Sequence, residues 1–283
     1  MGRVSTLGRP GGTDIDALLV AELLLLGLGI GFLAGLLGIG GGALMVPFLT
    51  LVLEHRGVAP AQAVKMAIAT SMGTILFTSM SSVRAHHAHG AVRWDLVRGL
   101  APGIVIGGLA AGAGAFALLK GAWLALFFAA FIAVSATQML RRQRTVPTRQ
   151  MPGTAGQLAA GGVIGFLSGL VGAGGAFVSV PIMIWCNVPV HNAMATSAAL
   201  GFPIAVAGTV GYLISGWSLP AALPGAFGYL YLPALLIIAS ASVLAAPLGA
   251  RAAHRLDTRQ LRRAFAMLLY SLAAYMLYNA LRG

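Results

Sequence analysis

The chain has 283 residues, of which 58% are hydrophobic and only 8% are charged, and its formal net charge is +12. Soluble globular proteins carry about 25% charged residues. Residues 150 to 250 include no Asp, Glu, Lys or Arg, and a soluble fold with so large an uncharged surface would associate through it. The composition therefore excludes an ordinary soluble protein and predicts an integral membrane protein in contact with the lipid bilayer.

The basic residues occur in short clusters between apolar segments. That distribution orients helices in a bilayer and is not the pattern expected of a protein that binds nucleic acid. The single cysteine, Cys186, excludes a disulfide framework and a thiolate metal cluster, and no cofactor is expected. The few acidic residues lie in tails, in loops or near segment ends, so a proton relay through carboxylates at the membrane centre is not expected.

Two parts of the chain are copies of each other. Gly31 to Pro47 reads GFLAGLLGIGGGALMVP and Gly165 to Pro181 reads GFLSGLVGAGGAFVSVP, with ten of seventeen positions identical at an offset of 134. A signal peptide is not expected at the first apolar run, because that run recurs inside the chain. We interpret the chain as a tandem duplication, with an N-terminal tail (1–16), a first membrane repeat (17–140), a basic cytoplasmic linker (141–156) and a second membrane repeat (157–283).

Each repeat is predicted to contain five apolar segments. In chain order they are 17–38, 41–53, 62–83, 95–119 and 121–140, then 157–172, 174–186, 190–214, 226–250 and 260–281. A full crossing needs about 20 residues, so the piece after each glycine cluster is too short, and the segment before the second cluster is short as well. We expect each pair to form a glycine-broken helical hairpin that dips into the membrane, within an all-α polytopic protein of two inverted repeats and about 8–10 membrane segments.

The loop charges predict how the repeats are oriented. Arg84, Arg93 and Arg98 follow the third segment of the first repeat, whereas the equivalent loop at 215–225 has no charge. The next loop shows the reverse, with Lys120 alone in the first repeat and five arginines in the second. Because cytoplasmic loops are the basic ones, the two repeats are predicted to lie in opposite orientations, with both termini outside.

The glycine clusters are the strongest candidates for a binding site. Glycine lets the chain leave helical geometry, and the helix that restarts after it presents free N–H groups and the positive end of its dipole. In lipid such groups must face a cavity, water or an anion. Close packing of helices through small residues is the alternative, but two copies beside short segments favour a site for a small anion. The candidates are Gly38, Gly40, Gly41, Gly172, Gly174 and Gly175.

The twofold GFLxGLxGxGGxxxxVP pattern, with an Ala-Thr-Ser segment after each copy, resembles the TauE/SafE family of sulfite and organosulfonate exporters. The resemblance covers the chain from Gly31 to the C-terminus. It implies a polytopic protein of the inner (plasma) membrane that moves small sulfur-containing oxyanions outward, and it does not fix the substrate.

Hydroxyl donors suit such an anion because they add no charge that would trap it. Thr70 with Ser71, and Thr196 with Ser197, supply them at an offset of 126, although Ser and Thr in membrane helices also bond to the carbonyl four residues earlier. Lys65 aligns with His191 and Met66 with Asn192. Lys65, His191 and Asn192 are therefore candidates for a paired cationic and polar rim, with interface anchoring of Lys65 as the alternative.

Two other functions, a metal transporter and a membrane enzyme, are compatible with parts of the sequence. His86, His87 and His89 allow a metal or cation transporter, although a solvated loop is the more ordinary interpretation and no metal site is assigned. Ser197 with His191 is the best pair for a membrane enzyme, but six residues on one helix separate them, no carboxylate orients the histidine, and no catalytic residue is assigned. The sequence is also compatible with a homo-oligomer.

Overall fold

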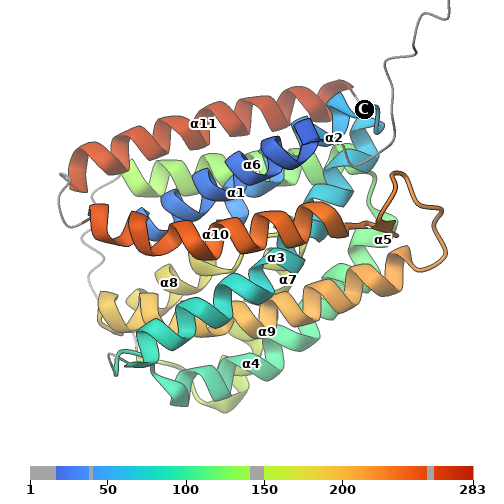
Figure 1. Ribbon diagram of the computed structural model, residues 1–283. Helices are drawn as coiled ribbons and strands as arrows, with labels where there is room; N and C mark the ends of the chain where they lie inside the picture. The colour runs from blue at the N-terminus through green and yellow to red at the C-terminus, as the bar shows by residue number, and fades with distance from the viewer. Residues whose placement is uncertain (1–16, 38–40, 89, 141–149, 254–257, 283) are drawn as a thin grey trace, which may run out of the picture.

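The structure is a computed structural model that describes residues 17–37, 41–88, 90–140, 150–253 and 258–282. It is a bundle of helices with one small antiparallel hairpin of two strands (Figure 1). The elements in chain order are α1 (Ala17–Leu37), α2 (Gly42–His55), α3 (Pro60–Ala88), α4 (Trp94–Leu109), the π-helical segment η1 (Ala110–Ala115), α5 (Phe116–Leu118), α6 (Gly121–Leu140), α7 (Thr154–Val171), α8 (Ala176–Trp185), α9 (Val190–Gly216), β1 (Ala226–Phe227), β2 (Leu230–Tyr231), α10 (Leu232–Ala253) and α11 (Thr258–Arg282).

The helix lengths confirm an all-α polytopic membrane protein, since seven helices in the described ranges are long and apolar enough to cross a membrane. The 21 residues of α1 extend about 32 Å, which matches a hydrocarbon core of about 30 Å. By contrast, α2 has 14 residues and α8 has 10. The expectation that the segment before the second glycine cluster is also too short is wrong, because the 18 residues of α7 form one unbroken apolar helix up to the glycines.

Two segments differ from the sequence prediction. The apolar stretch predicted from residue 226 begins with β1 and β2, and the helix starts only at Leu232. Gly225 and Gly228 have positive φ angles of 80° and 56°, which glycine adopts without strain, so the chain turns here before α10. At the other boundary α7 begins at Thr154, inside the stretch predicted as linker.

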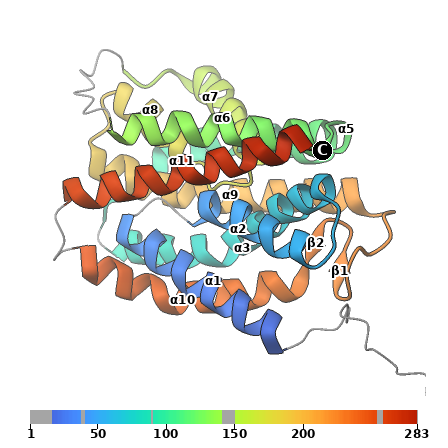
Figure 2. The same cartoon turned by 90° about the horizontal axis from the view of Figure 1, so that it is seen from above.

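The helices of each repeat pack mainly against helices of the other repeat (Figures 1 and 2). Helix α1 packs along α10, while its counterpart α7 packs along α4, which is the counterpart of α10. Helix α3 packs against its own counterpart α9, and α6 against α11. This pattern of contacts is what a two-fold relation between the repeats produces.

Matching glycines bring these helices close together. A Cβ atom on Gly31 of α1 would clash with the backbone of Ser242 on α10, and one on Gly165 of α7 would clash with the backbone of Ile104 on α4. The Ser242 hydroxyl also donates a 2.9 Å hydrogen bond to the carbonyl of Gly27. Small residues at such crossings let apolar helices gain van der Waals contact inside a membrane.

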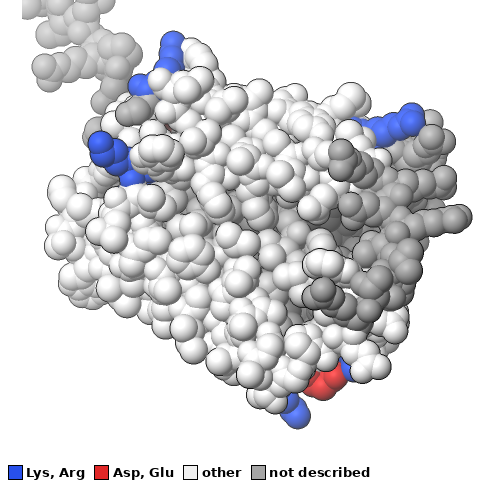
Figure 3. Space-filling view, turned by 180° about the vertical axis from the view of Figure 1, so that it is seen from behind, with Lys and Arg blue, Asp and Glu red and all other residues white. Residues whose placement is uncertain are grey.

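The outer surface is apolar between two ends that carry the charges. Leu25, Ile106 and Leu244 are 70%, 62% and 73% exposed, as expected of side chains that face lipid. Figure 3 shows described Lys and Arg side chains at opposite ends of this face with an uncharged belt between them. We call the end where α6 finishes and α7 begins the linker end, and the opposite end, where α1 begins and α11 finishes, the β-hairpin end (left and right in Figure 1).

Candidate functional site

The two glycine breaks meet inside the bundle. Helix α2 starts at Gly42 after the N-cap residue Gly41, and α8 starts after the N-cap residue Gly175. Gly41 and Gly175 occupy the same position in the two copies. A Cβ atom on Gly42 would lie 2.8 Å from the carbonyl oxygen of Gly172, so the start of the first short helix touches the second break.

Backbone donors at the start of α8 have no acceptor among the residues that the structure describes. The N-cap residue makes no side-chain hydrogen bond, and within the described ranges the N–H groups of Gly174, Ala176 and Phe177 bond to nothing. Space remains beside them, because Gly174 and Ala176 are only partly buried and a Cβ atom on Gly174 would have no neighbour closer than 3.6 Å. Donors at the positive end of a helix dipole, next to free space, are suited to an anion.

The second break depends on glycine at two positions. Gly172 and Gly175 have positive φ angles of 67° and 78°, a left-handed conformation that costs other residues about 1–2 kcal/mol. A Cβ atom on Gly172 would also lie 2.9 Å from the carbonyl oxygen of Ile68. The turn between α7 and α8 therefore excludes side chains at both positions.

The two serines of the Ala-Thr-Ser segments lie at the breaks and are buried, but each hydroxyl has a protein partner. Ser71 donates to the carbonyl of Gly172 at 2.6 Å and also contacts the carbonyl of Ile68 at 3.2 Å. Ser197 accepts a 2.7 Å hydrogen bond from the hydroxyl of Ser179 on α8. Ser71 thus joins α3 of the first repeat to the glycine break of the second.

The two threonines join the repeats at opposite ends. The Thr70 hydroxyl accepts a 3.0 Å hydrogen bond from the N–H of Tyr231, and the Thr196 hydroxyl accepts one of 3.0 Å from the N–H of Arg93. Tyr231 immediately precedes α10 and Arg93 immediately precedes α4, which are equivalent helices of the two repeats. Both threonines are fully buried, and each hydroxyl binds a loop of the other repeat. The sequence analysis did not predict these partners.

Lys65 lies at the β-hairpin end and contacts aromatic rings. Its Nζ is 5.4 Å from the ring centre of Phe116 and 5.3 Å from that of Tyr229, distances at which a cation is attracted to an aromatic face. The described residues include no carboxylate that pairs with it. Lys65 therefore brings a partly buried positive charge to the β-hairpin end.

The structure does not bring His191 to Lys65. His191 is exposed at the start of α9, at the linker end, where the Asn192 side chain donates a 2.9 Å hydrogen bond to the carbonyl of Ala91. The two repeats place equivalent residues at opposite ends of the bundle, so a single rim of Lys65 and His191 does not form. His191 is also separated from Ser197, which is buried against Ser179, and this arrangement offers no base to the serine.

Three predicted residues lie outside the described ranges: Gly38, Gly40 and His89. His86 and His87 lie in the last turn of α3, which corrects the expectation of a loop at these two residues. His87 accepts a 3.2 Å hydrogen bond from the indole of Trp94. The described residues contain no group of three His, Cys, Asp or Glu side chains that could hold a metal ion.

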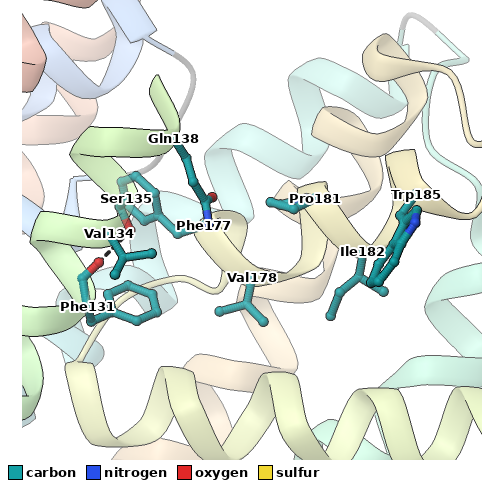
Figure 4. Close-up of a pocket in the computed structure, with 9 residues that line it drawn as sticks. All are labelled: Phe131, Val134, Ser135, Gln138, Phe177, Val178, Pro181, Ile182 and Trp185. Atoms are coloured by element: carbon teal, nitrogen blue, oxygen red, sulfur yellow. Dashed lines mark hydrogen bonds between the residues drawn. The ribbon is translucent and has the colours of Figure 1, made fainter. Parts of the chain in front are cut away.

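A groove of about 460 Å³ separates α6 from α8. Figure 4 shows the nine lining side chains, from Phe131 to Gln138 on α6 and from Phe177 to Trp185 on α8. Most are apolar, and Gln138 reaches from α6 towards α8. The ring centres of Phe131 and Phe177 are 6.1 Å apart, next to the first turn of α8. The groove therefore runs along α8 beside the second break.

Two polar residues at the second break were missed by the sequence analysis. Ser168 and Ser179 stand where the first repeat has Ala34 and Met45. Both are buried. The signal that would have found them is the repeat alignment itself, because a polar residue replaces an apolar one at a matched position only in the second copy.

These features define a polytopic membrane protein whose two repeats place uncapped helix starts at a common centre. The sequence profile of the family described as "Sulfite exporter TauE/SafE" matches residues 23–276. The chain belongs to this family, as its duplicated glycine motif predicted.

The similar proteins are membrane transporters by name. A "Probable membrane transporter protein" of Haemophilus influenzae is 33% identical over 255 residues, which cover 89% of this chain and 96% of the relative. One of Methanocaldococcus jannaschii is 26% identical over 261 residues, covering 92% and 96%, and one of Bacillus subtilis is 30% identical over 232 residues, covering 72% and 84%. No solved structure matches the chain significantly. The protein is a membrane transporter.

Proposed function

We propose that this transporter exports small sulfur-containing oxyanions, sulfite or sulfonates, across the inner membrane. The family description names sulfite, whereas the relatives' names specify no substrate. The few acidic residues of the chain lie away from the glycine breaks in the sequence, so no carboxylate is expected there to repel an anion. Backbone N–H groups bind such a substrate without a fixed positive charge that would hold it too tightly.

The observation that carries the proposal is the contact between the two breaks beside unpartnered donors. Gly42 touches Gly172, and the N–H groups of Gly174, Ala176 and Phe177 have no acceptor among the described residues. These residues are partly buried, and an unpaired donor costs about 1–3 kcal/mol when it is fully buried. An oxyanion at the start of α8 would satisfy them, and binding sites at the midplane between repeats are typical of secondary transporters.

The charge distribution supports an orientation for export. The ends of helices that lie at the linker end carry Arg84 (end of α3), Arg93 and Arg98 (start of α4) and Arg263 (start of α11). Under the positive-inside rule this end would lie in the cytoplasm. Both termini then lie outside, as expected for inverted repeats. Because the cell interior is negative, the membrane potential drives an anion outward with about 2.3 kcal/mol per charge per 100 mV, so export needs no proton-carrying carboxylate.

The groove supports α8 as the moving part. In the first repeat, Glu54 at the end of α2 accepts hydrogen bonds from Tyr275 at 3.2 Å and Asn279 at 2.6 Å, both on α11. In the second repeat the groove separates α8 from α6, the counterpart of α11. We infer that α8 moves across this groove and exposes the second break to the linker end, while α2 stays fixed on α11.

The test compares anion flux through purified protein in proteoliposomes with sulfite, thiosulfate, sulfoacetate and chloride. Gly174→Trp should reduce sulfite flux at least about tenfold, because the indole would fill the space beside the free N–H groups. Gly174→Ala is the matched control, since an added Cβ meets nothing closer than 3.6 Å and should leave most of the flux.

Both variants are compared at equal amounts of inserted protein. Sulfite flux no faster than that of empty liposomes would refute the proposed substrate. If Gly174→Trp transports sulfite as fast as the wild type, the proposed binding site is refuted, but sulfite remains the proposed substrate.

A further inference from the structure

The two repeats differ in one side chain that faces the glycine break. Position 34 is alanine in the first copy, and the matched position 168 is serine in the second. Ser168 is 1% exposed, and its hydroxyl has no hydrogen-bond partner among the described residues. A buried hydroxyl without a partner costs about 1–3 kcal/mol, so its presence in only one copy calls for a ligand.

Ser168 lies in the last turn of α7, directly beside the start of α8. Its carbonyl accepts the N–H of Gly172 at 2.9 Å and that of Ala173 at 3.3 Å, which closes the end of α7. A Cβ atom on Gly175, the N-cap residue of α8, would lie 3.2 Å from the Ser168 hydroxyl oxygen. The hydroxyl therefore points at the N-cap of α8.

Two independent sets of unpaired donors thus occupy one place. Helix α8 offers the backbone N–H groups of its first turn, and Ser168 offers a hydroxyl proton. The first repeat has no such hydroxyl, because the Ala34 side chain stands at the same position, 3.7 Å from where a Cβ on Gly41 would lie. Among the described residues, first-turn N–H groups lack acceptors at the starts of both α2 and α8, and only the second break adds an unpaired buried hydroxyl.

We propose that the Ser168 hydroxyl is a ligand of the transported anion, which is held at the start of α8 and not shared equally between the repeats. This inference rests on the proposed function. The ligand is an anion with at least two oxygen atoms, one for the backbone N–H groups and another for the hydroxyl. Chloride has a single acceptor atom and gains less from the same pair of donors.

The experiment measures sulfite and chloride affinity by calorimetry on the full chain in lipid nanodiscs. Ser168→Ala should weaken sulfite binding about tenfold, which corresponds to about 1.4 kcal/mol, and should weaken chloride binding less. Its melting temperature without ligand should stay equal or rise, since no protein hydrogen bond is lost. Alanine fits this position sterically, as Ala34 does in the other repeat.

Ser242→Ala is the matched control, because it removes an equally buried serine hydroxyl that bonds to Gly27. It should lower the melting temperature and leave sulfite affinity unchanged. A structural role for Ser168 would produce that same pattern in Ser168→Ala and would overturn the inference.

The remaining outcomes distinguish failure of the Ser168 ligand role from failure of the proposed transport function. Wild-type protein that binds sulfite, with Ser168→Ala binding it equally well, overturns the ligand role and leaves the proposed function intact. Sulfite affinity restored by adding Ala34→Ser to Ser168→Ala overturns the unequal placement. Wild-type protein that neither binds nor transports sulfite overturns the proposed function together with the inference.

Discussion

Thr70 and Thr196 hold the two repeats together, and replacing both with valine tests this directly. Valine has nearly the shape of threonine but cannot accept a hydrogen bond. Thr196→Val removes the acceptor of the Arg93 N–H, and Thr70→Val removes the hydroxyl that accepts the Tyr231 N–H. Each change therefore breaks one hydrogen bond between repeats without creating a cavity.

The expected magnitude follows from the burial of each pair. Both threonines are 0% exposed, and a typical intramolecular hydrogen bond contributes about 0.5–1.5 kcal/mol. The two sites lie at opposite ends of the bundle, so their effects should add to about 1–3 kcal/mol. At roughly 2 °C per kcal/mol for a chain of this size, the double variant should melt about 2–6 °C lower in detergent.

Thr50→Val is the control for this prediction. Thr50 is also 0% exposed, but its hydroxyl donates to the carbonyl of Val46 in its own helix. Such back-bonding within a helix adds little stability, so this variant should melt within about 1 °C of the wild type. If the double variant melts no lower than Thr50→Val, the threonines do not connect the repeats.

Three further changes have defined outcomes. Gly172→Ala should lower the melting temperature by several degrees and reduce flux, because the residue has a φ of 67° and contacts the Ser71 hydroxyl; equal melting and flux would contradict this. Lys65→Met should slow anion flux at low ionic strength and less at high, since salt screens the lost charge; a slowing independent of salt would point to packing. Glu54→Ala should speed hydrogen exchange in α2 without changing α8, because the bond to Asn279 is lost; unchanged exchange would show that α2 is held by other contacts.

Much of the fold is readable from the sequence because a membrane demands long apolar runs. The predicted stretch 121–140 coincides with α6, and the stretch 17–38 ends one residue after α1. The glycine clusters marked both helix restarts, since the same position, Gly41 and Gly175, forms each N-cap. Long apolar runs and glycine clusters can be recognised in the sequence itself, and these parts of the prediction needed nothing else.

Contacts between distant segments could not be read in this way. Ser71 and Gly172 are 101 residues apart in the chain, and nothing in either copy of the motif names the other as its partner. In this structure the Ser71 hydroxyl donates its proton to the carbonyl of Gly172, and its donation to an anion stays a prediction. The rim expected from Lys65 and His191 failed because equivalent residues of the two repeats lie at opposite ends of the bundle.

The differences between the copies locate function better than their similarities. Shared residues such as Gly31 and Gly165 serve close packing in both repeats, and both threonines fasten loops. Where the copies differ, the second gains the buried hydroxyl of Ser168, while the first gains Glu54, which fixes α2 to α11. If the proposed site is right, the first hairpin serves mainly for support and the second for binding. On this reasoning, the substitutions that change anion affinity should concentrate at the second break.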